Sequence, residues 1–214
     1  MSNLDVWNSN LIKDIEKLNN KLEVYDIWLD KYQEYIKAAK KTIIDLGCGI
    51  GNDTMYIKSC GNDVLSVDFS DEALRIINQN IEGANTLKMD FEKEWLLEKE
   101  SADLIIANLS LHYFDTETTF RIINDIKNTL VDEGILIARL NSINDKNYGS
   151  SNYLNEIEPH YYETMSIKKR FFDENDINFF FSSFKTISCK EENVLSLVHK
   201  KKKIVWECVF KKTI

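Results

Sequence analysis

The stretch TIIDLGCGIG, residues 42–51, is the most informative part of the sequence for the fold. It begins as a short apolar run rich in β-branched residues, which favours a buried strand. It continues into three closely spaced glycines, Gly47, Gly49 and Gly51, which permit positive φ and let a ligand approach the backbone closely. Residues 52–60 then favour a helix whose N-terminus points free N–H groups and the positive dipole end at the ligand. The stretch therefore predicts a strand, a ligand-binding turn and a helix.

Downstream of this turn, predicted strands alternate with predicted helices. Ser70 and Asp115 are placed to cap two of the helices. Such alternation favours one doubly wound, mostly parallel sheet with helices on both faces, a Rossmann-like α/β fold. The further strands are expected at residues 64–67, 86–89, 104–107 and 135–140.

The ends of the chain depart from this alternation. Apolar residues at steps of three and four predict an amphipathic helix over residues 4–22 and a second one over 25–36, which together would form an N-terminal lid. Near the C-terminus, Asp173 is placed to cap a helix, and two β-like segments follow near 184–198 and 203–211, which supply an antiparallel C-terminal strand.

A chain of 214 residues suits a single domain. Within it we expect a helical cover (1–40), a cofactor-binding core (41–141), an irregular insertion that serves as a substrate lid (142–172), and a C-terminal helix with a strand pair (173–214). Insertions at this point of an α/β sheet can cover the crevice at the carboxyl ends of the strands.

The composition excludes several classes of partner. A net charge of −8 disfavours nucleic acid, and the basic run at residues 200–203 is expected to be a solvated hairpin turn. No apolar run approaches the roughly 20 residues that span a bilayer, and residues 1–5 lack the features of a signal peptide, so we expect no membrane partner and a cytoplasmic protein. The sequence assigns no oligomeric state.

The cysteines and histidines give no sign of a metal centre. The four cysteines lack CxxC spacing and are expected to act as small apolar residues in a reducing compartment. The three histidines lack the spacing of metal ligands. We therefore predict no metal site.

Two acidic residues flank the glycine turn. Asp68 ends the next predicted strand, where its carboxylate can accept hydrogen bonds from both hydroxyls of a ribose. Asp45 precedes the glycines by two positions, where a carboxylate would repel a pyrophosphate and suits a cationic ligand such as a sulfonium. The third glycine also comes one residue too early for the dinucleotide pattern GxGxxG. These features favour a cationic nucleoside ligand over a dinucleotide.

Taken together, these motifs resemble those of the class I S-adenosylmethionine-dependent methyltransferases, in their order and over about residues 42–141. Residues 45–51 look like the family's first motif, and Asp68 looks like its ribose-binding acid. Residues 89–91 resemble the third motif, which contains an adenine-binding Asp, and residues 107–113 resemble the fourth motif. Residues 139–142 and 170–173 are similar to a group of small bacterial methyltransferases. The resemblance implies S-adenosylmethionine as cofactor and S-adenosylhomocysteine as product. The cofactor-binding residues that it implies are Asp45, Gly47, Cys48, Gly49, Gly51, Asp68, Phe69, Met89, Asp90, Phe91, Asn108 and Leu109.

Methyl transfer is an in-line displacement that requires a close, collinear nucleophile and exclusion of water. A general base is needed only when the nucleophile keeps its proton at neutral pH. His112 is the best candidate for that base, and a structural histidine is the alternative. Tyr113 beside it would line the methyl channel or belong to the core. Phe69 and Phe91 would stack on adenine or be plain core.

Candidate contacts to the substrate come from both predicted lids. Tyr25 and Trp28 belong to an aromatic stripe that is core on one side and faces the pocket on another. Tyr161 and Tyr162 lie in the insertion. Arg139 and Arg170 would bind an anionic substrate, with internal ion pairs as the alternative.

The sequence thus predicts a methyltransferase that acts on a small molecule. A nicotinamide-dependent oxidoreductase and a non-catalytic S-adenosylmethionine-binding module are the alternatives. Enzymes that methylate DNA base amino groups carry a [DNS]PP[YFW] motif, whereas residues 108–111 read NLSL without proline.

Overall fold

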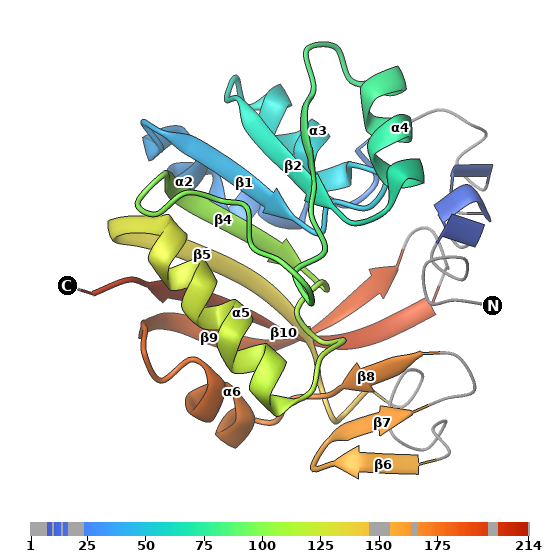
Figure 1. Cartoon of the computed structure of the whole chain (residues 1–214), viewed down its shortest axis with the longest axis vertical. Helices are drawn as coiled ribbons and strands as arrows, with labels where there is room; N and C mark the ends of the chain where they lie inside the picture. The colour runs from blue at the N-terminus through green and yellow to red at the C-terminus, as the bar shows by residue number, and fades with distance from the viewer. Residues whose placement is uncertain are drawn as a thin grey trace.

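The computed structural model describes residues 8–9, 11–13, 15–16, 24–145, 155–163, 167–196 and 201–213. Its centre is a seven-stranded sheet in the order β3-β2-β1-β4-β5-β10-β9 (Figure 1). The strands are β1 (Thr42–Leu46), β2 (Val64–Asp68), β3 (Asn85–Lys88), β4 (Ala102–Asn108), β5 (Leu130–Asn141), β9 (Lys185–Ser196) and β10 (Lys201–Lys211). The first five run parallel, and β10 pairs antiparallel with both β5 and β9. The predicted fold class is confirmed.

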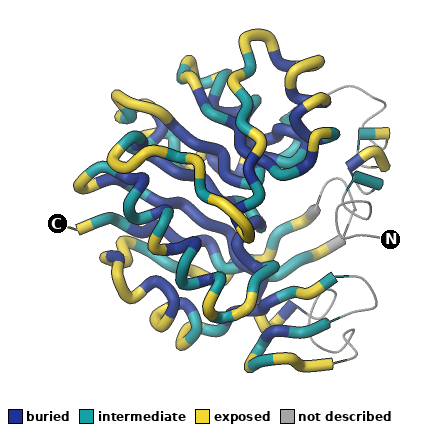
Figure 2. The backbone as a smooth tube through the Cα atoms, viewed as in Figure 1, coloured by how far each residue is buried: buried dark blue, intermediate teal, exposed yellow. Residues whose placement is uncertain are grey.

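Helices cover both faces of the sheet. One face of the sheet, with Ile43, Leu104 and Ile137, is covered by the 3-10 helix η1 (Trp28–Tyr32), α2 (Gln33–Ala38) and α3 (Asn52–Ser59). On the other face, α5 (Thr116–Thr129) and α6 (Glu174–Phe180) bury their apolar sides, as Figure 1 shows in front of the sheet. Helix α4 (Asp71–Asn80) packs beside β2 and β3. The buried backbone follows the central strands (Figure 2).

Three predicted helix caps are present. The side chains of Ser70, Asp115 and Asp173 accept hydrogen bonds from the backbone N–H groups of Ala73, Thr118 and Asp176. These bonds satisfy donors that have no partner inside the helix. Asp173 and Asp176 complete a reciprocal capping box, so the sequence signals for these helix starts were correct.

Four expectations about the elements are corrected. The predicted second helix begins only at Trp28, as a 3-10 helix, because the backbone groups of Tyr25 and Asp26 are hydrogen-bonded to the side chain of Asn52. The fifth strand begins at Leu130 rather than Ile135, because Leu130 already pairs with Ala102. Residues 201–203, expected in a hairpin turn, pair with β9 as part of β10.

The fourth correction concerns the segment 142–172, which contains a second sheet where no regular structure was expected. Strands β6 (Asn155–Glu158), β7 (Tyr161–Glu163) and β8 (Lys168–Arg170) pair antiparallel in that order. The strands have three or four residues each, too few for their side-chain alternation to stand out in the sequence. Residues 146–154 and 164–166 of this segment, and most of the predicted helix at 4–22, lie outside the described residues.

The cysteines also differ from expectation at one pair. Cys189 of β9 lies opposite Cys208 of β10, and the two form a disulfide. The expectation that every cysteine is a free apolar side chain is therefore wrong for this pair. Cys48 is free and buried, and Cys60 is free and partly buried.

Candidate functional site

The three glycines adopt the left-handed backbone that the turn requires. The φ angles are 80° at Gly47, 52° at Gly49 and 89° at Gly51. The turn is anchored to β2, since the N–H groups of Gly47 and Cys48 both donate to the carbonyl oxygen of Val67. The carboxyl end of β1 is thus fixed beside the end of β2, where Asp68 lies.

Two of the glycines also leave space that neighbouring side chains of the protein occupy. A Cβ atom on Gly47 would lie 2.4 Å from the Cβ of Ser110, and one on Gly51 would lie 2.9 Å from Ile77. A Cβ on Gly49 would meet only a methyl of Leu11, at 3.9 Å. Packing therefore requires glycine at positions 47 and 51, whereas at Gly49 the positive φ favours glycine and the space beside it is open.

Asp68 is held rigidly under the turn. Its Oδ2 accepts a hydrogen bond from the backbone N–H of Gly49 at 3.0 Å, and its Oδ1 accepts one from that of Ser70 at 2.9 Å. The carboxylate is 7% exposed, and burial raises its pKa. Each oxygen keeps a lone pair for a further donor, as a ribose hydroxyl requires.

Two more carboxylates complete an acidic wall. Burial first, and then the charge of Asp53, raise the pKa of Asp45 to about 8. Thr54 donates a hydrogen bond to Asp45 at 2.7 Å. Burial also raises the pKa of Asp53, although Asn52, Trp28 and Asn108 all donate to its carboxylate. Three buried carboxyl groups close together favour a positively charged ligand.

Asn52 fastens the N-terminal segment to this wall. Its Oδ1 accepts hydrogen bonds from the N–H groups of Tyr25 and Asp26, both at 3.0 Å, and its Nδ2 donates to the carbonyl oxygen of Asp26. This brings Tyr25 to the rim of the pocket. Asn52 and Asp53 were not predicted as site residues, although their place directly after the glycines, in the first turn of a helix, was a usable signal.

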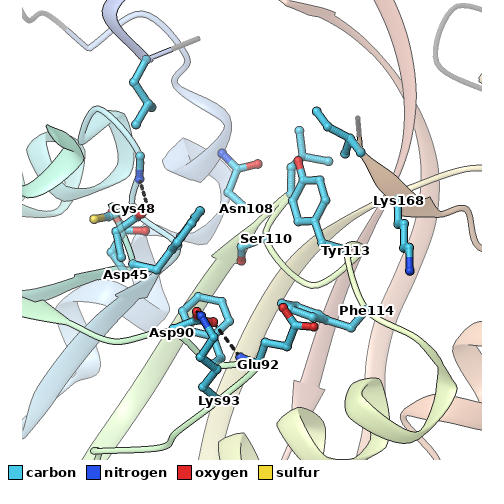
Figure 3. Close-up of a pocket in the computed structure, with 18 of the residues that line it drawn as sticks. Asp45, Cys48, Asp90, Glu92, Lys93, Asn108, Ser110, Tyr113, Phe114 and Lys168 are labelled. Atoms are coloured by element: carbon cyan, nitrogen blue, oxygen red, sulfur yellow. Dashed lines mark hydrogen bonds and ion pairs between the residues drawn. The ribbon is translucent and has the colours of Figure 1, made fainter. Parts of the chain in front are cut away.

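These groups line a cavity of about 1060 Å³ at the carboxyl ends of β1, β2 and β4. Figure 3 shows Asp45 and Cys48 on one side, Asn108 and Ser110 at the back, and Tyr113 and Lys168 on the other side. The predicted site residues that line the cavity are Tyr25, Asp45, Gly47, Cys48, Gly49, Asp68, Phe69, Asp90, Phe91, Asn108, Leu109, Tyr113 and Tyr161. Thirteen scattered positions are thereby brought to one pocket.

Of the third motif, residues 89–91, two side chains line the pocket and one lies in the core. Phe91 lines the cavity and packs edge-on against Trp95, with ring centroids 6.4 Å apart. Asp90 also lines it, with its carboxylate 2.7 Å from the ammonium of Lys93. Met89 is fully buried, and its sulfur accepts a hydrogen bond from the N–H of Leu96. Met89 therefore shapes the wall from behind.

The far wall comes from the insertion. Tyr161 is buried, and its hydroxyl donates to the carbonyl oxygen of Tyr113 at 3.0 Å. Glu158 and Lys168 line the cavity beside it, a contribution that the sequence did not reveal. Tyr162 is not among the lining residues and packs against Phe171 instead.

His112 lies behind the pocket wall rather than in it. Its ring is 1% exposed and stacks obliquely on Tyr113, with centroids 4.2 Å apart. Burial, and then the charges of Lys203 and Lys169, hold the pKa of His112 well below its usual range. The imidazole is therefore neutral at pH 7.

The two predicted substrate arginines are engaged inside the fold. Arg139 pairs with Asp26 at 2.6 Å and with the buried Glu207 at 2.7 Å, and its guanidinium lies 4.4 Å from the centre of the Trp28 ring. Arg170 pairs with Glu158 at 2.7 Å. Neither arginine is among the residues that line the cavity, nor is Trp28. The structure matches the ion-pair alternative at both positions.

One group with potential metal ligands does occur in the described part of the chain. His160, Asp173 and Asp176 place ligand atoms within 4.8 Å of one another. His160 Nδ1 lies 2.6 Å from Asp176, whose carboxylate also serves the cap of α6. The group therefore has a structural role at the start of this helix.

The chain is similar to known methyltransferases in sequence and in structure. Residues 43–134 match the family model described as a methyltransferase domain. The curated relatives include the ribosomal protein L11 methyltransferase of Alkaliphilus metalliredigens, 28% identical over 109 residues, which are 49% of this chain and 33% of that protein. The chain spans from a third to less than two thirds of the length of the curated relatives that it matches.

Solved structures share the fold over nearly the whole chain. An S-adenosylmethionine-dependent methyltransferase of Methanosarcina mazei has a TM-score of 0.70 at 17% identity, over 92% of this chain and 97% of that one. The 1,6-didemethyltoxoflavin-N1-methyltransferase of Burkholderia thailandensis, with bound 1,6-didemethyltoxoflavin and S-adenosylhomocysteine, has a TM-score of 0.63 at 16% identity, over 98% and 88%. Among the described residues, no helix is both long and apolar enough to cross a membrane.

Proposed function

We propose that this chain, a member of the class I S-adenosylmethionine-dependent methyltransferases, transfers a methyl group from S-adenosylmethionine to a small-molecule acceptor. The proposal rests on one observation: the cavity extends without interruption from the glycine turn to the side chains supplied by the insertion. The glycine turn with Asp68 lies at one end, and Tyr113, Tyr161 and Lys168 lie at the other. One continuous space of about 1060 Å³ can hold a cofactor and an acceptor side by side.

The lining residues fit the cofactor. Asp68 would hold the ribose hydroxyls, and Phe69, Phe91 and Leu109 would flank the adenine. The acidic wall of Asp45 and Asp53 suits a ligand with a sulfonium and an α-ammonium group. When bound, S-adenosylmethionine supplies a methyl group activated by the positive charge on its sulfur.

The chain's own residues would then position the acceptor and exclude water. Tyr113 and Tyr161, joined by a hydrogen bond, close the side of the cavity opposite the glycines. In-line displacement gains most from such positioning. For an acceptor that keeps its proton, His112 is our candidate base, since its neutral ring lies directly behind Tyr113.

Calorimetric titration tests the cofactor assignment. S-adenosylmethionine and S-adenosylhomocysteine should bind the wild-type protein, whereas NAD and NADP should not. Asp68→Ala should weaken binding by roughly tenfold to a hundredfold, because it removes charge-assisted hydrogen bonds. Asp63→Ala, at a fully exposed carboxylate away from the cavity, is the matched control and should bind like the wild type. Nicotinamide binding in place of the sulfur ligands would contradict the proposal.

Turnover is tested separately with methyl-labelled S-adenosylmethionine. The protein is incubated with a panel of small hydroxy, amino and thiol compounds, and labelled product is measured. Transfer to one of them supports an enzyme that acts on small molecules. Tight cofactor binding with transfer only to proteins would contradict that part of the proposal.

A further inference from the structure

A group of polar side chains lies directly behind Tyr113, outside the cavity already described. His112 follows β4, Asn141 ends β5, Lys169 lies in β8 and Lys203 lies in β10. We call these four residues, without Tyr113, the rear cluster. Four segments that are distant in sequence supply it, and the mechanism proposed above uses only His112.

Backbone hydrogen bonds bring these segments together. The N–H of Arg170 donates to the carbonyl oxygen of His112 at 2.7 Å, and that of Phe172 donates to the carbonyl oxygen of Asn141 at 2.8 Å. Val205 lies directly opposite Asn141 in the β5–β10 pair. Because side chains alternate along a strand, Lys203 lies on the same face of the sheet as Val205 and hence as Asn141.

Two members of the rear cluster have unused hydrogen-bonding groups. Asn141 is fully buried and His112 nearly so. Among the described residues, both atoms of the Asn141 side-chain amide and both ring nitrogens of His112 lack a hydrogen-bond partner. An unsatisfied buried polar group costs about 1–3 kcal/mol, so such groups are rare unless they serve a ligand or the reaction.

The other two members bring positive charge. Burial, and then the charge of Lys169, lower the pKa of Lys203 to about 7. Burial also lowers the pKa of Lys169. Asp145 opposes both shifts, and one of its oxygens accepts a hydrogen bond from the N–H of Ile204 at 3.1 Å. An anion beside these ammonium groups would offset the cost of burying their charge.

Tyr113 lies between the cavity and two members of the rear cluster, His112 and Lys169. Tyr113 lines the cavity, while its ring centroid lies 4.2 Å from that of His112 and 5.7 Å from the ammonium nitrogen of Lys169. Movement of this tyrosine would open His112 and Lys169 to the cavity. The rear cluster is therefore within reach of a molecule bound on the acceptor side of the cavity.

We infer that the rear cluster of His112, Asn141, Lys169 and Lys203 holds an oxyanion, a carboxylate or a phosphate, of the methyl acceptor. The inference rests on the proposed function, because it assigns a substrate class to the same site. The ammonium groups balance the charge, and the amide of Asn141 and the imidazole of His112 supply hydrogen bonds. His112 would then touch the acceptor, as its proposed role requires.

The experiment uses protein saturated with S-adenosylhomocysteine and labelled at histidine. Benzoate, phenyl phosphate and the neutral analogue benzamide are titrated while the imidazole resonances are followed by NMR. His112→Gln assigns the resonance of His112. Benzoate or phenyl phosphate should shift this resonance and leave that of His160 in place, whereas benzamide should shift neither. The titration itself uses only the wild-type protein, and a variant is needed only for the assignment.

Variants then test the residues. Asn141→Ala and Lys203→Met should each weaken binding of the anionic probe at least tenfold while binding of S-adenosylhomocysteine changes less than twofold. Lys202→Met, at the exposed neighbour on the same strand, is the matched control and should change neither. Normal binding of S-adenosylhomocysteine without a shift of His112, or equal shifts with benzamide, overturns the oxyanion subsite alone. Failure of S-adenosylhomocysteine to bind the wild type overturns the proposed function instead.

Discussion

The indole nitrogen of Trp28 donates a hydrogen bond of 2.9 Å to the carboxylate of Asp53. This bond joins the N-terminal η1 segment to the first turn of α3, directly after the glycine turn. Neither residue is exposed by more than a few per cent. The N-terminal segment is thereby coupled to the acidic wall of the cofactor site.

Replacement of Trp28 by Phe tests this coupling. The variant keeps most of the buried aromatic surface but removes the donor to Asp53. We expect a loss of about 1–3 kcal/mol in the free energy of unfolding, as for a buried charged group deprived of one partner. Urea denaturation measures the loss, and calorimetry should show weaker binding of S-adenosylhomocysteine. Unchanged values of both quantities would contradict the coupling.

Alanine substitutions at two glycines with similar φ can separate the effect of packing from that of backbone strain. Gly47→Ala forces a Cβ atom to within 2.4 Å of Ser110 in a backbone with φ 80°. Gly61→Ala has a similar φ of 86° but meets no atom within 4 Å, so it is the matched control. We expect about 1–2 kcal/mol of destabilisation at Gly61 from backbone strain alone, and a clearly larger loss at Gly47. Equal losses in thermal or urea unfolding would show that packing plays no part.

Gly49→Ala should behave differently from Gly47→Ala. The added Cβ would meet only a methyl of Leu11 at 3.9 Å, so the loss of stability should resemble that of Gly61→Ala. Because Gly49 lines the cavity and its N–H is bonded to Asp68, ligand binding should suffer more than stability. Calorimetry with S-adenosylhomocysteine on the folded variant tests this. Wild-type affinity would place the ligand away from Gly49.

The ion pair of Arg139 with Glu207 predicts a structural effect. Glu207 is 3% exposed, and although burial alone would raise its pKa, Lys31 and Arg139 lower it on balance. Arg139→Met should cost up to about 3 kcal/mol, because it removes one of the two cationic partners of a buried carboxylate, while Lys31 still pairs with it. A depressed carboxyl pKa gives stability that is present above the unfolded value of 4.5 and is lost as the pH falls. The wild type should therefore lose more stability than the variant on acidification, as urea unfolding at several pH values will show.

Asp45 gives cofactor binding a pH dependence. Its pKa of about 8 means that the carboxyl group is mostly protonated at pH 7 in the free protein. A cationic ligand favours the ionised form, so binding should release a proton, and affinity should rise with pH and level off above about 8. Calorimetry in two buffers of different ionisation enthalpy counts the protons. Asp45→Asn should reduce the number released, and an unchanged count would exclude Asp45 as the source.

The raised pKa of Asp45 also affects the stability of the free protein, which falls as the pH rises, whereas cofactor affinity is expected to rise. A carboxyl group whose pKa is higher in the folded state stabilises the fold most below its unfolded value of 3.8. Its contribution is lost as the pH rises towards 8. The acidic wall therefore costs stability at neutral pH, and a bound cation would recover part of that cost.

The amino-acid sequence alone predicted the strand–turn–helix at residues 42–59, the parallel core and the three capped helices. These features depend on local signals: positive φ at glycine, side-chain caps and the period of apolar residues. The acid at position 68 was also predictable, because the carboxyl ends of neighbouring parallel strands meet at one edge of the sheet.

Which polar residues face the cavity depends on contacts between distant parts of the chain. The sequence left anion binding and internal ion pairs open for Arg139 and Arg170, and Glu207 and Glu158 pair with them inside the fold. His112 is placed behind Tyr113 by a bond from the backbone of Arg170, which lies in a strand that the sequence did not indicate. Burial and long-range pairing fix the charge and direction of a side chain, and neither is encoded in the local pattern.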